Sequence, residues 1–248
     1  MASRGGIRPA PDGTPADWVV QRIGPFGSGV GGLLPAGFAS YARVLHPAWA
    51  GGRPVRWADA AAWAGRIAHP LAQFHLIMSP APGSGTGPRP WDQLPDDGSM
   101  PPGTFAALRD VLAAHTSTPD RCWFCVLRWH DTSEEPGAAD EPGAASAQPP
   151  PESASGPLVE LPYRTYLLLE GPLDAAGDLR VAPTTPQSPS LFWPDDRAWC
   201  VATDVDLDST YLGGSAALVA DLLADDRLEV FSVDVTDPVA ATSDDLNL

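Results

Sequence analysis

The chain has 248 residues and a formal net charge of −16, from 31 acidic and 15 basic residues. A surface of that sign repels a phosphate backbone, so the charge argues against general nucleic-acid binding. All the basic residues are arginines, and the absence of lysine excludes Schiff-base chemistry and a P-loop lysine.

The cellular location is predicted from what the sequence lacks. The first residues contain no apolar core of a signal peptide, and no apolar run approaches the ~20 residues of a membrane span. Three cysteines, Cys122, Cys125 and Cys200, are too few for a secreted disulfide framework. We therefore expect a cytoplasmic protein that makes no membrane contact.

The N-terminal part begins with a stretch rich in glycine and proline at residues 1–16, which we expect to be flexible. A domain is expected over 17–248, and its residues 17–23 have the pattern of a first strand. The loop at residues 27–32 superficially matches a glycine-rich dinucleotide-binding turn. Residues 33–35, Leu-Leu-Pro, follow where that motif requires a helix, so a flexible connection is the better interpretation.

The middle of the chain alternates between regular elements and loops. Residues 38–46 alternate as a strand, and the alanine-rich run at 56–66 predicts a helix. A long Pro/Gly/Asp loop covers 79–103, after which Thr104 is placed to cap a helix. The run at 121–129 is apolar on both faces, as a central strand should be.

The second half contains a low-complexity segment at 131–157, which is too polar and proline-rich to pack and predicts a disordered insertion. Strands are predicted at 163–169 and 228–235, and Ser215 is placed to cap a helix at 216–224. Strands in pairs with occasional helices favour an α+β fold. We expect a mixed or mainly antiparallel sheet with about three helices, in a single domain with long Pro/Gly-rich loops.

The most suggestive stretch is an apolar run that leads into three alternating acids, Asp204, Asp206 and Asp208, and then into an expected polar turn at 209–211. On a strand these side chains point to one face, ~7 Å apart in succession. Carboxylate oxygens suit Mg²⁺ or Ca²⁺, so the three aspartates are candidate metal ligands. An EF-hand loop does not fit, because the sixth and twelfth positions counted from Asp204 are serines.

The same acids offer an enzymatic alternative. Asp206-Leu-Asp208-Ser-Thr210 resembles the D-x-D-x-T signature of haloacid-dehalogenase-like phosphatases, which implies a phosphoryl-accepting Asp206 and a general acid at Asp208. That family also needs a later basic residue and an acidic pair, whereas only 38 of the 248 residues follow Thr210. A divalent-metal-dependent hydrolase or phosphatase-like enzyme therefore stays the alternative, with Arg43 or Arg197 contacting an anionic substrate.

Two further groups of residues are candidates for chemistry. Cys122 and Cys125 form C-x-x-C, but an offset of three on a strand sends their sulfurs to opposite faces, so we expect buried structural cysteines. His46 lies beside Arg43 at a strand end and could line a pocket; a buried or surface histidine is the alternative. The candidate ligand-binding residues are Arg43, His46, Arg197 and Tyr211.

Nine tryptophans are many for this length. Four lie in or beside predicted core strands, where packing explains them: Trp123, Trp129, Trp193 and Trp199. Three others are candidates for an exposed partner-binding patch: Trp18, Trp49 and Trp91. Large aromatic side chains dominate the energetics of protein interfaces, so an acidic shell with aromatic anchors fits a protein-interaction surface.

Three blocks of the chain, 34–47, 193–206 and 209–215, resemble blocks in uncharacterised proteins of high-GC bacteria. The resemblance implies a bacterial protein and no particular chemistry. The acidity, the tryptophans and the lack of a complete catalytic pattern favour a non-enzymatic module. We expect it to bind a protein partner, without a cofactor, as an accessory, regulatory or immunity-type protein.

Overall fold

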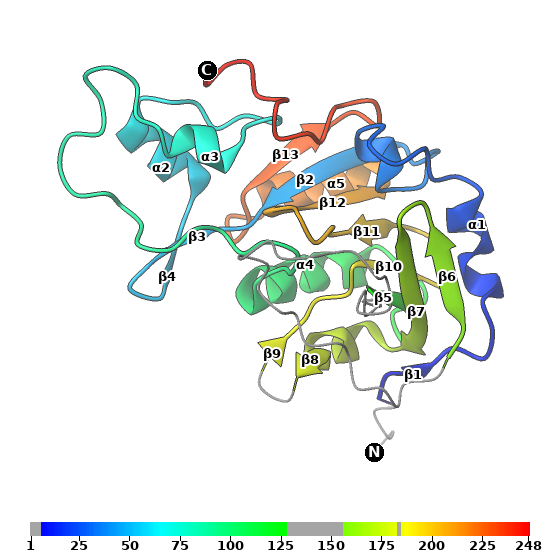
Figure 1. Cartoon of the computed structure of the whole chain (residues 1–248). Coiled ribbons are helices and arrows are strands. Elements are labelled where there is room, and N and C mark those ends of the chain that lie inside the picture. The colour runs from blue at the N-terminus through cyan, green and yellow to red at the C-terminus, as the bar shows by residue number, and fades with distance from the viewer. Residues whose placement is uncertain (1–5, 128–155, 183–184) are drawn as a thin grey trace, which may run out of the picture.

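The computed structural model describes residues 6–127, 156–182 and 185–248 (Figure 1). The predicted insertion at 131–157 therefore lies almost wholly outside the described residues, as does Trp129. The α-helices are α1 (Asp17–Val20), α2 (Trp57–Ala64), α3 (Phe74–Ile77), α4 (Pro102–Ala114) and α5 (Ala216–Ala224). The strands are β1 (Arg8–Pro9), β2 (Ser40–Leu45), β3 (Ala48–Ala50), β4 (Arg53–Val55), β5 (Cys122–Leu127), β6 (Leu158–Leu161), β7 (Arg164–Gly171), β8 (Arg180–Ala182), β9 (Thr185–Pro186), β10 (Leu191–Pro194), β11 (Cys200–Ala202), β12 (Ser209–Gly214) and β13 (Val230–Val233).

One large sheet dominates the molecule. Its strand order is β1-β7-β5-β10-β11-β12-β2-β13, with β6 also paired to β7, and every pairing described is antiparallel. The predicted α+β class and mainly antiparallel sheet are confirmed. The expected count of about three helices is too low, because α1 and α3 are single turns of four residues, too short to show a helical period in the sequence. None of the helices within the described ranges is long and apolar enough to cross a membrane.

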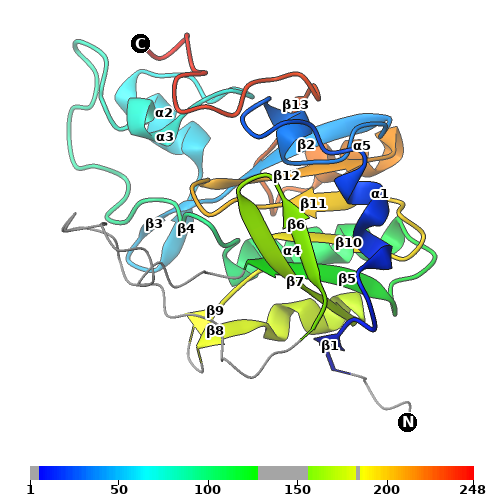
Figure 2. The same cartoon turned by 45° about the vertical axis from the view of Figure 1, so that its right-hand side comes forward.

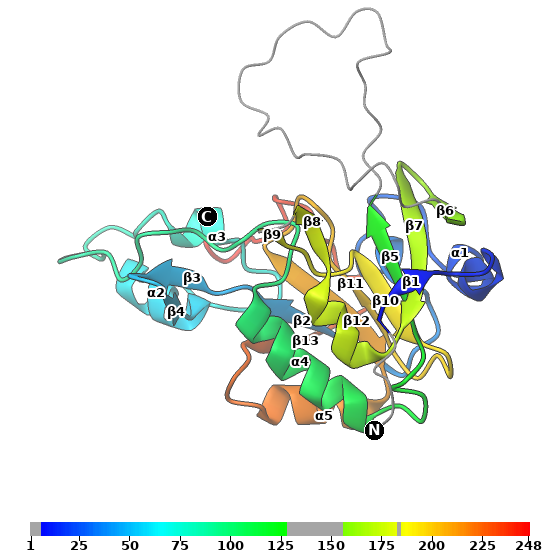
Figure 3. The same ribbon diagram turned by 90° about the horizontal axis from the view of Figure 1, so that it is seen from below.

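The two faces of the sheet carry separate cores, as strand alternation requires. Phe124 and Phe192 pair across β5 and β10 and pack on the face that α4 and α5 cover (Figure 3). Their neighbours Trp123 and Trp193 pack on the other face, against α1. A third cluster, which includes Trp57, joins α2 and α3 to the end of β2, to one side of the sheet in Figure 1.

The three cysteines are free and buried, which confirms the prediction made for Cys122 and Cys125. Cys122 belongs to the core under α4 and α5, and Cys125 belongs to the core on the opposite face. Burial raises the pKa of the Cys122 thiol to about 12, and burial also raises the pKa of Cys125. Both therefore stay protonated and unreactive at neutral pH.

Two predictions are wrong near proline, one of an element type and one of a helix start. The expected strand at residues 17–23 is instead a helical segment, in which a 3-10 turn at Thr14–Ala16 with a proline in its first positions leads into α1. The helix α4 begins at Pro102 with Pro101 as its N-cap residue, so Thr104 lies inside the helix and does not cap it. Proline at a first helical position has its φ already set for a helix, which outweighs the local pattern.

The region from 199 to 224 also differs from the prediction in part. The apolar run ends as β11, the aspartates lie in a hairpin turn at 203–208, and the expected polar turn at 209–211 is the start of the buried strand β12. The hydroxyl groups of Ser209 and Thr210 are hydrogen-bonded to Arg43 and His46. The polarity of these residues in the sequence does not reveal that such partners exist. The predicted helix at 216–224 is confirmed, and the Ser215 hydroxyl accepts a hydrogen bond from the backbone N–H of Leu218 at 3.1 Å.

The glycine-rich loop packs directly on the backbone that follows β13. Val30 donates its backbone N–H to the carbonyl of Asp237 at 2.9 Å, and Gly31 donates to the carbonyl of Val235 at 2.8 Å. Gly29 has φ 84° and ψ −152°, and a Cβ there would overlap the carbonyl oxygen of Asp237. The glycine is therefore required for close backbone contact.

Replacing Gly29 by Ala should lower the free energy of unfolding by several kcal/mol, because the new Cβ must displace the Asp237 carbonyl. Gly27 has a similar φ of 78°, but a methyl group added there would meet no atom within 4 Å, so Gly27→Ala is the matched control. It should cost only the left-handed backbone penalty of roughly 1–2 kcal/mol. Urea denaturation measures both values, and an equal loss in the two variants would contradict the packing argument.

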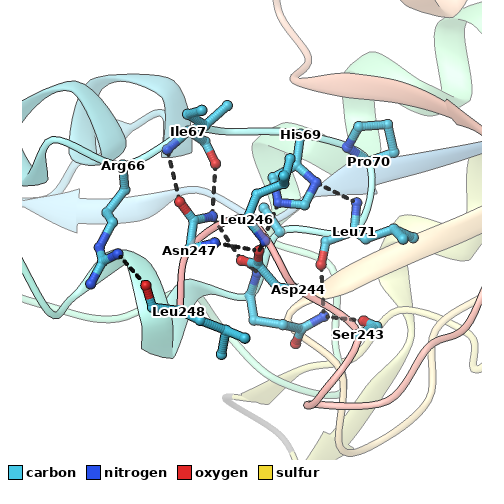
Figure 4. A network of polar contacts seen from close by, with 12 residues as sticks. Arg66, Ile67, His69, Pro70, Leu71, Ser243, Asp244, Leu246, Asn247 and Leu248 are labelled. Carbon is cyan, nitrogen blue, oxygen red and sulfur yellow. Dashed lines mark hydrogen bonds and ion pairs between the residues drawn. The ribbon is translucent and has the colours of Figure 1, made fainter. Parts of the chain in front are cut away.

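The segment after β13 is fastened at its far end by the carboxylate of Asp244, which is 1% exposed (Figure 4). This carboxylate accepts hydrogen bonds from the backbone N–H of Gln73 at 3.0 Å, from His69 Nε2 at 2.8 Å and from Asn247 Nδ2 at 2.7 Å. Asn247 also bonds both backbone groups of Ile67. Burial disfavours the charge of Asp244, but the bonds from Asn247, Gln73 and His69 outweigh it and hold its pKa below the ordinary value.

Replacing Asp244 by Ala should lower the free energy of unfolding by about 2–3 kcal/mol, since several buried donors lose their acceptor together. Asp245→Ala, at the exposed neighbouring position, should change it by less than about 0.5 kcal/mol. Thermal or chemical unfolding compares the pair. A loss at Asp244 no larger than that at Asp245 would show that the network does not hold the segment in place.

Candidate functional site

A buried arginine joins the sheet to the α2–α3 side of the molecule. Arg43, on β2, is 2% exposed and donates from Nε to Ser209 Oγ at 2.9 Å. Its Nη1 donates to the carbonyl oxygens of Pro70 at 3.0 Å and Ala72 at 2.8 Å. Its Nη2 lies 3.6 Å from Asp208 Oδ1. The guanidinium is therefore satisfied from within the chain, as a buried charge requires.

The aromatic rings around Arg43 complete this junction. Its guanidinium lies 5.3 Å from the ring centroid of Trp57 and 5.8 Å from that of Tyr211. Burial raises the pKa of Tyr211, although the positive charge of Arg43 opposes that shift. Burial likewise raises the pKa of Asp208 against the effect of Arg43. Arg43 and Tyr211, both candidate ligand-binding residues, thus contact each other inside the protein.

His46 lies next to this junction and is fully buried. Its Nδ1 is 2.6 Å from the carbonyl oxygen of Asp96, which can only accept, so the proton is on Nδ1. Its Nε2 then accepts from the hydroxyl of Thr210 at 2.9 Å, and Thr210 accepts from Thr203 at 2.7 Å. Burial lowers the pKa of His46 to about 4. This chain of hydrogen bonds is closed off from solvent, because Thr203 and Thr210 are at most 1% exposed.

The remaining predicted ligand-binding residue, Arg197, lies at the opposite end of β11 from the aspartates. It occupies the β10–β11 turn with φ 55°, and its guanidinium lies 5.5 Å from the ring centroid of Trp18. The four candidate ligand-binding residues therefore do not form one cluster. Arg43, His46 and Tyr211 share a buried junction, whereas Arg197 is exposed elsewhere.

The three aspartates do not converge on one point, because they lie in a turn and not along a strand. Asp204 and Asp206 both pair with Arg164, at 3.0 and 3.4 Å, whereas Asp208 faces Arg43. Among the residues that the structure describes, no group of three or more His, Cys, Asp or Glu side chains could hold a metal ion. The binding of Mg²⁺ or Ca²⁺ by the aspartates stays a prediction.

An accessible groove lies on the outer side of the same turn. Its volume is about 360 Å³, and its walls come from the glycine-rich loop, the β11–β12 turn and the segment after β13. The apolar wall consists of Phe26, Leu33, Leu207, Pro238, Val239 and Ala240. Asp204 and Asp206 also line the groove. A smaller cavity of about 30 Å³ shares Phe26, Gly32, Leu33 and Asp204 with this groove and reaches Arg164.

Two exposed aromatic rings, here called the rim, lie together beside the groove: Phe26 lines it, and Tyr163 contacts Phe26. Phe26 is 49% exposed and Tyr163 is 82% exposed, and their ring centroids are 5.2 Å apart. The guanidinium of Arg164 lies 5.4 Å from the Phe26 ring centroid. Tyr163 belongs to the turn of the β6–β7 hairpin, which lies beside α1 in Figure 2. Sequence reasoning missed this rim, because it assigned Tyr163 to a strand and Phe26 to a connecting loop.

Tyr163 is held in a backbone conformation that tyrosine rarely adopts. It follows Pro162 in a two-residue hairpin turn and has φ 62°. In a turn of this kind, proline is favoured at the first position and glycine or asparagine at the second. A left-handed backbone costs a bulky residue roughly 1–2 kcal/mol. The dipeptide Pro-Tyr between two apolar runs is the one signal in the sequence that predicts this turn.

The expected tryptophan patch is not formed. Trp18 and Trp91 are buried, at 6% and 3% exposure, and only Trp49 of the three is partly accessible. Trp18 packs edge-on against both Phe38 and Trp193, which explains its burial. The prediction of exposed anchors at Trp18 and Trp91 is wrong, and exposed aromatic rings occur at Phe26 and Tyr163 instead.

Comparisons with models of protein families, with curated proteins and with solved structures found no match to this chain. The resemblance to blocks of high-GC bacterial proteins stays a prediction. The geometry of the junction and of the groove is therefore the basis for a functional proposal.

The buried neutral His46 should make stability depend on pH. Its folded pKa of about 4 is below its ordinary value of 6.5, so between these values the unfolded chain binds a proton that the folded chain excludes. The stabilisation is fully present above pH 6.5 and is lost as the pH falls towards 4, by about 3 kcal/mol in total. His46→Gln should remove this dependence.

Urea unfolding at pH 7 and pH 4.5 measures the effect for the wild type and for His46→Gln. The raised pKa values of Asp208 and Asp97 act in the opposite sense, but they do so in both proteins, so the difference between the two isolates His46. Parallel profiles for the two proteins would show that His46 does not carry the dependence.

Proposed function

We propose that this chain is a non-enzymatic protein-binding module, of accessory, regulatory or immunity type, that holds a segment of its partner in the groove beside Phe26 and Tyr163. The observation that carries the proposal is the exposed tyrosine ring at a strained turn next to an apolar groove. Backbone strain retained at an exposed position is a feature of binding and catalytic sites.

The strained residue contributes little to the free chain. Its ring is 82% exposed, so its apolar surface is not removed from water by folding. Glycine or asparagine would suit the turn better. A partner that covers the ring would bury a large apolar surface on a side chain with few rotatable bonds, which is why tyrosine is frequent among the residues that dominate binding energy.

The groove has the size and lining of a binding site. Its volume of about 360 Å³ falls in the range of roughly 300–1,000 Å³ that is typical of ligand pockets, and most of its wall is apolar. The two aromatic rings of the rim lie beside it, so a ligand that contacts both rim and groove must be larger than the groove itself. This favours a macromolecule, and the net charge of −16 disfavours a nucleic acid.

The buried chain of a histidine and two threonine hydroxyls does not favour an enzymatic reaction. His46, Thr210 and Thr203 make a continuous chain of hydrogen bonds, but all three are at most 1% exposed. A substrate cannot approach any of them without opening the junction. The three side chains are uncharged and hydrogen-bonded to one another, which fits a structural role at the boundary between the sheet and the α2–α3 side.

Tyr163→Gly should separate binding from folding. Relief of the left-handed strain offsets the lost contact with Phe26 and the flexibility of glycine, so the free energy of unfolding should stay within about 1 kcal/mol of the wild type. Capture from a lysate of the source organism should recover a specific partner with the wild type and lose it with Tyr163→Gly.

Leu223→Ala is the control, because it removes another exposed large apolar side chain, 48% exposed, from α5, which covers the opposite face of the sheet. It should retain the partner. Equal recovery by the wild type and Tyr163→Gly would place the interface elsewhere, and loss with Leu223→Ala alone would place it on the α4–α5 face.

A further inference from the structure

We infer that the groove takes a basic segment of the partner protein, with an arginine or lysine side chain against Asp206 and a neighbouring apolar side chain between Leu33, Leu207 and Val239. This inference rests on the proposed function, because it names the kind of segment that the same groove would hold. The observations that support it are the unequal pairing of the two aspartates, the negative charge around them and the apolar wall beside them.

The two carboxylates at the groove are compensated to different degrees. Asp204 has a side chain that is 11% exposed and lies 3.0 Å from Arg164 Nη2. Asp206 has a side chain that is 82% exposed and lies 3.4 Å from the same nitrogen. Because Arg164 makes its shorter, more buried bond to Asp204, the charge of Asp206 stays largely available to a cation from outside.

Further acidic groups lie near the β11–β12 turn, where the backbone N–H of Gly98 donates to the carbonyl of Leu207 at 3.0 Å. Asp97 has a raised pKa, chiefly because of burial and then because of the negative charges of Asp206 and Asp96. Asp208 lies on the inner side of the same turn, and the charge of Asp97 contributes to its raised pKa. The carboxylates thus repel one another across the turn. A cationic side chain placed at Asp206 would relieve part of that repulsion.

The neighbouring wall selects for an apolar group next to the charge. Leu33, Leu207 and Val239 are partly buried against the core of the sheet, and each leaves part of its surface to the groove. Together with Phe26 they offer a surface for an aliphatic or aromatic side chain. A segment with a basic residue next to an apolar residue satisfies both halves of the site, whereas an acidic segment meets like charges at Asp204 and Asp206.

The charge of the whole chain acts in the same direction at longer range. A net charge of −16 attracts a basic partner and speeds its approach, and the attraction falls as salt screens it. The acidity of the chain, which disfavours nucleic acid as a partner, therefore favours a basic protein segment.

A random-peptide display library selected against the immobilised full-length chain tests the inference. Selected peptides should be enriched in arginine or lysine next to a leucine, valine or aromatic residue. A synthetic copy of the strongest peptide should bind more weakly as the salt concentration is raised. Asp206→Asn should weaken its binding about three-fold to five-fold, the effect of one exposed ion pair.

Asp221→Asn removes the same charge from α5 and is the matched control, which should leave binding unchanged apart from a small general effect of charge. Charge exchange gives the sharpest comparison. Asp206→Arg should lose the selected peptide, and replacing the basic residue of that peptide by glutamate should restore binding to Asp206→Arg.

Peptides that depend on Tyr163 but show no basic residue, or that bind Asp206→Asn as tightly as the wild type, would overturn this inference and leave the proposed function standing. A selection that yields no binders, or binders that are indifferent to Tyr163→Gly, would overturn the proposed function and this inference together.

Discussion

The burial of the Arg43 guanidinium constrains the rest of the structure, because a buried charge has to find its partners inside the protein. Those partners come from three places: the hydroxyl of Ser209 on β12, the carboxylate of Asp208 in the turn before it, and two carbonyl oxygens of the segment at 70–72. A single side chain therefore couples the sheet, the β11–β12 turn and the α2–α3 side. Removing any one of the partners of Arg43 would leave a buried donor of its guanidinium unpaired. Such a loss costs more free energy than the loss of an exposed ion pair.

The β11–β12 turn makes contacts on both of its sides. On the inner side, Asp208 faces Arg43 and the backbone carbonyl of Asp208 accepts from the N–H of His46 at 3.0 Å. On the outer side, Asp204 and Asp206 face Arg164 and the groove. The rigid inner contacts hold the outer carboxylates in place, so a partner would meet them already positioned. Preorganisation of this kind reduces the entropy lost on binding.

The opposite wall of the groove depends on a different constraint. The segment after β13 is held by the glycine-rich loop at one end and by the Asp244 network at the other. Between these two fastenings, Pro238, Val239 and Ala240 line the groove. Phe26, just before the glycine-rich loop, lines the same groove and contacts the ring of Tyr163 in the turn of the β6–β7 hairpin. The left-handed backbone at Tyr163 is held by the pairing of β6 with β7 on either side of the turn, which lets the fold tolerate its local cost.

The sequence by itself determined the features that depend on local periodicity and on single residues. The alternation at 38–46, the apolar run that predicts the central strand β5, the helix at 216–224 with its Ser215 cap, and the opposite faces of Cys122 and Cys125 all follow from the geometry of strands and helices. Tertiary structure alone decided where polar residues are buried and which distant segments meet. The polarity of Ser209 and Thr210 predicts a turn, but in the fold Arg43 and His46 are the hydrogen-bond partners of their hydroxyl groups. A polar residue can be buried in a sheet only when such partners exist. The groove and its rim combine Phe26, Tyr163, Asp206 and Val239 from four separated loops, and no local pattern encodes contacts that arise from strand order and backbone twist.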